Sequence, residues 1–505
     1  MTNKRFPLPS SLRNWLSIWG AVLASVSFII IVLLVLVSLV FSIGSSYLGI
    51  FIYIVLPVFL IIGLLMIPLG MLINRRKRKR TIPESESFKW PAIDFNNPSV
   101  RNATIIFGIG TVVFLLLSAI GSYEAFHYTE SVEFCGKLCH RVMEPEYVAY
   151  HQSSHEKVKC VECHVGTGAS WYVRSKLSGL YQVYSVTFNK YPRPIPTPVH
   201  NLRPARETCE ECHWTEKFYD RKLKMKRSYL ADEETTEWDI QLLLKTSATY
   251  SALGLQEGIH WHINPDVRIE YKTDTAHRGD IPWVRYTNKK TGEIHIYQDP
   301  ESKTDPALLQ TWETKTMDCM DCHNRPSHNY QPPQNFIDDA ITAGSISKSL
   351  PDIKVEAMTV LGQDYPTKDS AFRAISQQVN EYYTLMYEDI AKTRKADIDK
   401  AIKAIQEGYA RNIFPDMKVK WDKYPLHLGH LENNGCYRCH NDKHKSESGR
   451  VISRDCKLCH SILAQGKPGE MEFATSLQPL EFKHPIDINE EWRVKFCSEC
   501  HHTLY

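Results

Sequence analysis

The sequence predicts a membrane anchor of three transmembrane α-helices, followed by a mainly helical and coil domain with a small β-hairpin insertion. Three observations predict this fold class. The first 122 residues contain three long apolar runs, whereas the rest of the 505-residue chain is polar. All fourteen cysteines follow the third run, in seven close pairs, and a histidine stands directly after the second cysteine of each pair.

Three apolar runs are long enough to cross a membrane as helices. Residues 16–43 and 46–73 each exceed the length needed for a hydrocarbon core of roughly 30 Å. The third run, Ala103 to Ile120, is shorter but still adequate, and its Gly108 and Gly110 suit helix–helix contact in lipid. The first run is too long for a signal peptide and lacks a small-residue cleavage site, so we expect it to remain as a span.

Basic residues predict the orientation of these helices. Lys4, Arg5 and Arg13 precede the first run, and the basic block 75–80 follows the second, whereas the turn at 44–47 carries no charge. By the positive-inside rule both basic flanks are cytoplasmic, so the first two helices form a hairpin and the third crosses outward. We therefore expect a bacterial inner-membrane protein whose N-terminus is cytoplasmic and whose polar domain is periplasmic.

The cysteine pairs predict covalently bound haem. In Cys-x-x-Cys-His the two thiols add to the haem vinyl groups, and the histidine ligates the iron. Disulfides and zinc knuckles do not require that histidine, and a thioredoxin-like pair is not repeated seven times. We expect seven c-type haems attached at Cys135 and Cys139, Cys160 and Cys163, Cys209 and Cys212, Cys319 and Cys322, Cys436 and Cys439, Cys456 and Cys459, and Cys497 and Cys500, with proximal ligands His140, His164, His213, His323, His440, His460 and His501.

Fourteen further histidines are available for the second axial position. Bis-histidine ligation fills both axial positions of the iron and suits electron transfer. We expect distal ligands near the motifs, namely His155, His262, His328, His430, His444 and His484. His260 is the alternative to His262, and His427 competes with His430. Met143, beside the first motif, is either a thioether ligand, which would raise the potential of its haem, or a packing residue.

The order of these features predicts three domains: a membrane region at 1–123, a haem domain with the first three motifs at 124–230, and a C-terminal domain with the last four motifs at 231–505. Within the last domain, residues 284–297 alternate between apolar and polar around a glycine turn, which predicts a β-hairpin. Residues 369–411 show apolar spacings of three and four, which predict one or two amphipathic helices.

From Phe134 to Trp214 the chain resembles the NapC/NirT/NrfH family of membrane-anchored quinol dehydrogenases. The shared positions are Cys139-His140 with Met143, Ser154-His155, Val158, Cys160-Val-Glu-Cys163-His164, and Lys176 with Gly179. The resemblance implies a menaquinol pocket beside the first haem. It also implies Lys176 as a quinol-site residue, Met143 as an axial ligand of that haem and His155 as a distal ligand of another.

Two departures from the family pattern bear on the chemistry. Three residues separate Cys135 from Cys139, where the family has two. The family also carries an acid beyond the lysine, whereas this chain offers Gln182. Glutamine can hydrogen-bond a quinol hydroxyl but cannot accept its proton, which leaves Lys176 as the candidate acceptor.

The three spans and seven motifs together are similar to the seven-haem inner-membrane cytochromes of metal-reducing bacteria. We expect a quinol dehydrogenase that takes electrons from the menaquinone pool in the lipid and passes them to soluble periplasmic multihaem cytochromes. The alternatives are a terminal reductase of a small oxidant such as nitrite, which needs an open axial position, and a relay subunit of another dehydrogenase. A net charge of +3 gives no reason to expect nucleic-acid binding.

Reporter fusions test the predicted orientation. A reporter fused after residue 90 should behave as cytoplasmic and one fused after residue 505 as periplasmic, because the third helix crosses the membrane between them. Alkaline phosphatase and green fluorescent protein activities measure this. Phosphatase activity at both sites would contradict the assigned orientation.

Overall fold

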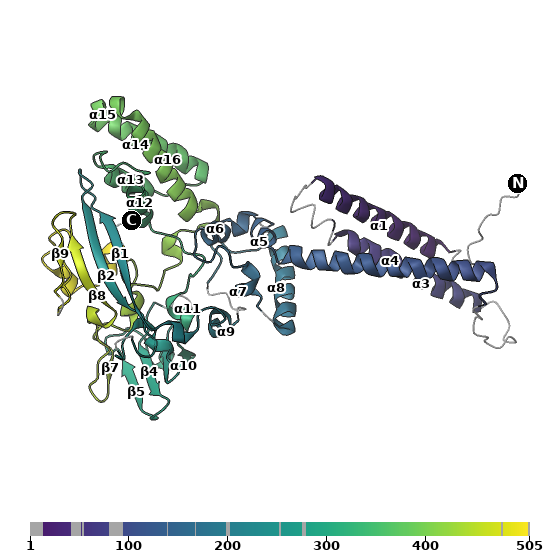
Figure 1. The fold of residues 1–505 in the computed structure, drawn as a ribbon, viewed down its shortest axis with the longest axis horizontal. Coiled ribbons are helices and arrows are strands. Elements are labelled where there is room, and N and C mark those ends of the chain that lie inside the picture. Colours follow the sequence, from purple (N-terminus) through teal and green to yellow (C-terminus); the bar gives the residue numbers. More distant parts are fainter. Residues whose placement is uncertain are drawn as a thin grey trace. The chain divides into compact units, whose positions relative to one another are not determined.

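A computed structural model describes residues 14–41, 52, 55–79, 94–138, 140–166, 168–197, 203–251, 254–274, 279–475 and 478–502. The chain divides into two compact units, Met1–His140 and Arg141–Tyr505. Figure 1 shows the helices and strands of both units. The finer division into three domains remains a prediction.

The first unit contains the three long apolar helices α1 (Trp15–Phe41), α3 (Leu56–Lys79) and α4 (Pro98–Thr129). Each includes a stretch that is long and apolar enough to cross a membrane, which confirms the predicted helical anchor. The third helix begins before Ala103 and continues past Ile120. Hydropathy marks only the lipid-compatible part of a helix, whereas backbone hydrogen bonds continue into the polar flanks.

Helices α1 and α3 pack through small residues. A Cβ added at Gly20 would come within 2.7 Å of the Gly63 carbonyl oxygen, so the two backbones touch there. Nearby, the Ser17 hydroxyl donates a 2.9 Å hydrogen bond to the Ile67 carbonyl oxygen. Close backbone approach and interhelical hydrogen bonds are the forces that hold helices together in lipid, where apolar burial gives no advantage.

The glycines of α4 do not take part in such contacts. A Cβ added at Gly108 or Gly110 would meet no atom of the described chain within 4 Å. The large apolar residues of this helix, such as Phe107 and Ile109, are exposed. The predicted role of Gly108 and Gly110 in helix packing is therefore wrong within the described chain, because the α1–α3 contact uses other glycines.

The second unit, together with the end of the first, carries the cysteine motifs on short helical turns. The first cysteine of each motif lies in a short helical turn, and in Cys160–His164 and Cys497–His501 the turn also contains the second cysteine and the histidine. A complete turn brings these three side chains together, because residues three and four apart lie on one side of a helix. These turns are α5 (Val132–Lys137), α7 (Cys160–His164), α9 (Ala205–Cys209), α11 (Cys319–Cys322), η6 (Gly435–Arg438), η7 (Cys456–Leu458) and α17 (Cys497–His501). The other helices outside the bundle described below are α6 (His140–Tyr150), α8 (Ala169–Thr187) and α10 (Pro306–Thr311).

Two antiparallel sheets lie in the second unit. The predicted hairpin is confirmed as β4 (Trp283–Asn288) and β5 (Ile294–Gln298), with Gly292 at φ +76° in the turn. It belongs to a five-stranded sheet of order β6-β3-β4-β5-β7, completed by β3 (Val267–Lys272), β6 (Lys315–Thr316) and β7 (Lys445–Ser446). The four-stranded sheet has the order β1-β2-β8-β9, made of β1 (Arg221–Tyr229), β2 (Glu237–Lys245), β8 (His460–Gly466) and β9 (Glu472–Phe473).

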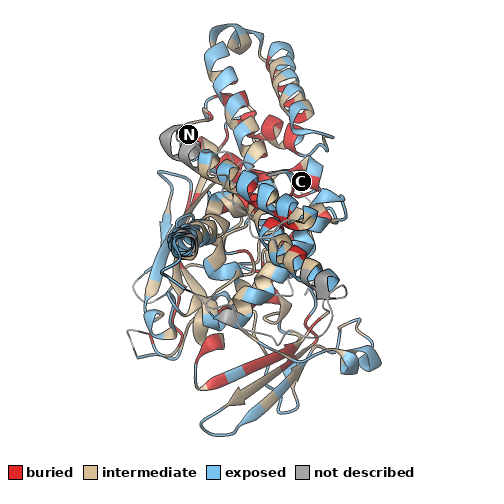
Figure 2. Cartoon of the chain, turned by 90° about the vertical axis from the view of Figure 1, so that its right-hand side faces the viewer, coloured by how far each residue is buried: buried red, intermediate tan, exposed pale blue. Residues whose placement is uncertain are grey.

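A helical bundle between the fourth and fifth motifs has its own apolar core. It consists of α12 (Pro333–Thr342), α13 (Ile353–Leu361), α14 (Lys368–Met386), α15 (Glu388–Thr393) and α16 (Lys395–Asn412). The predicted helical segment 369–411 therefore contains three helices, α14, α15 and α16. The backbone leaves helical geometry between them, at Tyr387 and Arg394. Ile375, Val379 and Tyr383 form the inner face of α14 and are fully buried; Figure 2 colours buried residues red.

Core truncation tests the independence of this bundle. Ile375→Ala should lower the free energy of opening of the bundle by about 2–5 kcal/mol, since it removes a fully buried side chain. Hydrogen exchange measured by mass spectrometry should show faster exchange in α12–α16 with unchanged haem content. Arg373→Ala, on the exposed side of the same helix, is the matched control. Equal exchange in both variants would contradict the assigned core.

Candidate metal centres

Six motif histidines face a second histidine in the structure. The ring centres of these pairs are 5.9–6.3 Å apart. The pairs, motif histidine first, are His164 with His328, His213 with His155, His323 with His260, His440 with His262, His460 with His430, and His501 with His484.

This separation fits an iron held between two imidazoles. Two metal–nitrogen bonds of about 2 Å each, extended to the two ring centres, give a separation of about 6 Å. Direct ring stacking would bring the ring centres closer than this, and a hydrogen bond between the rings would not repeat in six places. None of the thirteen described cysteines forms a disulfide, so each thiol remains available for thioether attachment. No cluster of three or more metal-binding side chains was found among the described residues, so a zinc site finds no support there.

Burial favours the neutral form of His164, His262 and His430, the form that metal ligation requires. Loss of solvation lowers the pKa of His164 and His262. The pKa of His430 falls to about 4, first through burial and then through the neighbouring His460. A neutral ring has a free lone pair for the metal, so the burial that disfavours the charged form favours the ligand form.

The structure brings five predicted distal ligands opposite a motif histidine: His155, His262, His328, His430 and His484. It adds His260, which the sequence analysis treated as the alternative to His262. The sequence signal for two ligands here was the short spacing of the histidines in Ile-His-Trp-His. In a turn, residues two apart can point toward different partners. Their roles as ligands remain predictions.

His444 and His427 lie elsewhere. His444 is 1% exposed, and its ring nitrogens lie 2.9 Å from Asn441 Oδ1 and 2.6 Å from the Ile281 carbonyl oxygen. Since both nitrogens are engaged, the structure does not support His444 as an axial ligand. His427 is also buried, with Nδ1 3.2 Å from the Asp321 carbonyl oxygen, and it is His430 that faces His460.

The first motif is described only in part. Cys135 lies in α5, whereas Cys139 and the side chain of His140 fall outside the described residues. Met143 lies in α6 and is half-buried. Haem attachment at this motif and the ligand role of Met143 therefore remain predictions.

Consecutive motifs are neighbours in space. Cys209 of the third motif and Cys319 of the fourth share a thiol hydrogen bond. Burial first, and then the thiol of Cys436 in the fifth motif, raises the pKa of Cys322 to about 12. Burial and the same Cys436 raise the pKa of Cys459, in the sixth motif, to about 11. The third to sixth motifs thus follow one another without a gap.

The second and seventh motifs extend this series at its two ends. Burial, then Glu162 and the nearby thiols that include Cys212, raises the pKa of Cys163, so the second motif adjoins the third. Cys456 is likewise among the groups that raise the pKa of Cys497, after burial, so the sixth motif adjoins the seventh. The six paired motifs form one continuous series in chain order.

Lys176 and Gln182 both lie in α8. The Lys176 ammonium is 4.9 Å from the centre of the Tyr172 ring, a cation–π contact, and the residue is half-buried. Gln182 is exposed. The two lie six positions apart, which places them on different sides of the helix. The structure therefore brings Lys176 together with Tyr172 but not with Gln182.

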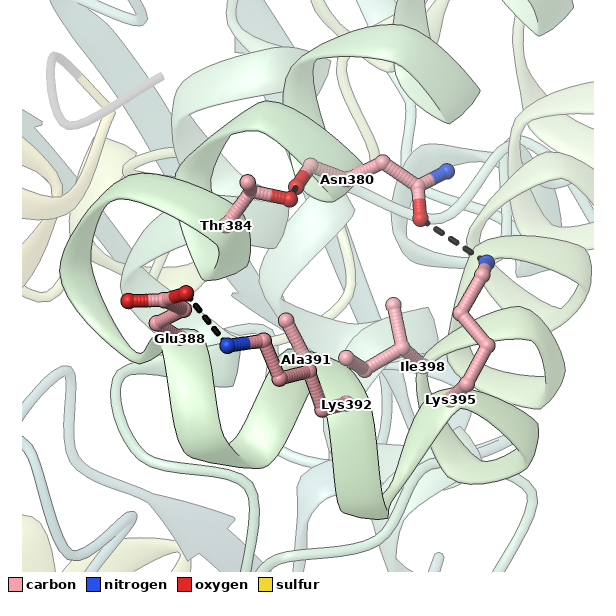
Figure 3. Close-up of a pocket in the computed structure, with 7 residues that line it drawn as sticks. All are labelled: Asn380, Thr384, Glu388, Ala391, Lys392, Lys395 and Ile398. Carbon is pink, nitrogen blue, oxygen red and sulfur yellow. Dashed lines mark hydrogen bonds and ion pairs between the residues drawn. The ribbon is translucent and has the colours of Figure 1, made fainter.

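A hollow in the helical bundle lies outside the motif segments. Asn380, Thr384, Glu388, Ala391, Lys392, Lys395 and Ile398 line it (Figure 3). Lys392 pairs with Glu388, and Lys395 lies 3.0 Å from the Asn380 amide oxygen. Both lysines are engaged within the bundle itself, so the hollow offers no free cation to a ligand.

Helices able to cross a membrane and repeated Cys-x-x-Cys-His motifs with paired histidines define a membrane multihaem c-type cytochrome. Residues 97–195 match the N-terminal region of the NapC/NirT cytochrome c family. The chain is similar to cytochrome c-type protein ImcH of Geobacter sulfurreducens, with 41% identity over 97% of this chain and 95% of that protein. This chain therefore belongs to the NapC/NirT cytochrome c family.

A more distant likeness is confined to the N-terminal part. Cytochrome c-type protein NrfH of Wolinella succinogenes is 29% identical over 117 residues, which cover 23% of this chain and 64% of that protein. No solved structure matches the chain. The names of both relatives and the cysteine pattern imply c-type haems in this chain.

Paired substitutions test the assignment of His430. His430→Ala should convert one haem from low spin to high spin, because it removes one of two axial imidazoles. His427→Ala, at a buried histidine three residues away, should leave the spin state unchanged. Electron paramagnetic resonance of the ferric protein measures both. A high-spin signal in the second variant alone would reverse the assignment.

Proposed function

We propose that this chain is a menaquinol dehydrogenase of the bacterial inner membrane, which carries seven c-type haems and passes electrons to soluble periplasmic multihaem cytochromes. The observation that carries the proposal is the continuous series of six histidine pairs. The family, whose members include quinol dehydrogenases, supports the choice of electron donor. The family also supports the choice of a membrane-bound entry point for electrons.

Each histidine pair supports electron transfer over catalysis at iron. When bound, the haems take up and release single electrons. The two histidines of each pair would hold the haem iron from both sides, which would leave a small oxidant no open site at these six centres. This arrangement weighs against the alternative of a terminal reductase at the paired motifs.

Helix α8 supports the quinol site. Large apolar side chains are exposed along it, namely Val173, Leu177, Leu180, Tyr181 and Tyr184. An exposed apolar surface of this kind suits contact with lipid or an apolar ligand. Lys176 stands among these residues and offers a polar group to a quinol hydroxyl. Helix α8 itself contains no acidic residue, so the Lys176 ammonium can donate a hydrogen bond to a quinol oxygen while water takes the protons released on oxidation.

Quinol-driven reduction tests the proposal. A reduced menaquinol analogue should reduce the haems of the purified protein, and Lys176→Ala should slow this by on the order of tenfold, a loss of about 1.4 kcal/mol. Stopped-flow absorbance of the haems measures the rate. Lys190→Ala, an exposed lysine just beyond α8, is the matched control.

Three outcomes would contradict parts of the proposal. No reduction of the wild-type protein by quinol removes the dehydrogenase activity. Equal rates for the Lys176 variant and its control remove Lys176 from the site. Intact-mass analysis of the same preparation counts the haems, and five or fewer would contradict the count of seven.

A further inference from the structure

One histidine pair differs from the other five in what surrounds it. Nδ1 of His328 lies 3.1 Å from Oε2 of Glu146 and 3.0 Å from the Glu146 carbonyl oxygen. Glu146 belongs to α6, and its side chain is 19% exposed. His328 faces His164 of the second motif, so a carboxylate stands directly behind one axial ligand of this centre.

The remaining paired histidines have weaker acceptors or none. Among the described residues, their ring nitrogens have only backbone hydrogen-bond partners: His155 with Pro326, His260 with Thr246, His262 with Ile259, His440 with Ser453, and His484 with Ile486. Nδ1 of His430, His460 and His501 has no hydrogen-bond partner in the described part of the chain. The carboxylate contact is therefore specific to the second motif.

Arg325 keeps this carboxylate in place. Its guanidinium lies 3.4 Å from both oxygens of Glu146 and 4.4 Å from the centre of the Tyr424 ring, and its side chain is 8% exposed. Its Nε also donates a 2.7 Å hydrogen bond to the His328 carbonyl oxygen. A cation at this distance offsets the cost of holding a charged carboxylate away from water. Arg325 therefore holds the Glu146 carboxylate in position beside the His328 ring.

The chemistry of the axial ligand determines whether Glu146 raises or lowers the reduction potential of the haem iron. An imidazole that donates its N–H to a carboxylate becomes more basic and gives more electron density to its metal. This stabilises ferric iron over ferrous iron and lowers the reduction potential. The positive charge of Arg325 favours a higher reduction potential. The Arg325 guanidinium contacts the Glu146 carboxylate, whereas the carboxylate contacts the imidazole ring of the ligand itself. The carboxylate effect therefore dominates.

We infer that Glu146 is a positioning residue that lowers the potential of the haem held by His164 and His328. The inference rests on the proposed haem occupancy of these pairs.

The test is a redox titration of the purified full-length protein followed by electron paramagnetic resonance. His328→Ala first identifies the low-spin signal of this centre, because that signal disappears when its ligand is lost. Glu146→Gln should then move the same signal to a higher potential, by at least a tenfold change in its one-electron equilibrium, about 59 mV. Signals from the other centres should not move.

Glu407→Gln is the control. It removes the same charge as Glu146→Gln, but from an exposed carboxylate in α16. Should Glu146→Gln lose haem, Glu146→Asp keeps the charge, shortens its reach, and should give a smaller upward shift. Unchanged potentials in a variant with full haem content would overturn the inference alone. A wild-type protein without haem at these pairs would overturn the proposed function instead.

Discussion

Two imidazoles held about 6 Å apart are the constraint on which the second unit depends, because four of the six pairs join segments more than fifty residues apart in sequence. His164 of the second motif meets His328 from beyond the fourth motif, and His213 meets His155 from before the second. An iron between each pair would act as a cross-link. The largest apolar cluster of the described chain lies in the α12–α16 bundle, which contains no cysteine. The segments that carry the motifs are therefore held together by interactions outside this cluster.

The series of neighbouring motifs is built from local turns and a few shared residues. His260 and His262 stand two residues apart in η3 (Ile259–Ile263) and face the fourth and fifth motifs, respectively. One short turn thereby fixes the distance between two centres. Strand β8 begins at His460 and pairs with β2, so the four-stranded sheet positions the sixth centre. Sheet and turn together position neighbouring histidine pairs.

The membrane helices follow a different rule from the paired centres. In lipid, helix association gains no free energy from the burial of apolar surface. Helices α1 and α3 therefore meet where Gly20 and Gly63 let their backbones touch. The same residue type at Gly108 and Gly110 in α4 meets no described atom. Glycine in an apolar run therefore permits a close contact without specifying one, and only the arrangement of helices decides which glycines are used.

The sequence alone determined everything that depends on short spacing: the haem-binding motifs, the three apolar helices, and the β4–β5 hairpin around Gly292. Local geometry suffices there, because thiols, histidine and turn residues act within a few positions. Tertiary structure decided the partners. His260 faces His323, whereas His444 hydrogen-bonds to Asn441 and Ile281. Which histidine reaches an iron, and which carboxylate stands behind it, depends on packing between segments that no local pattern encodes.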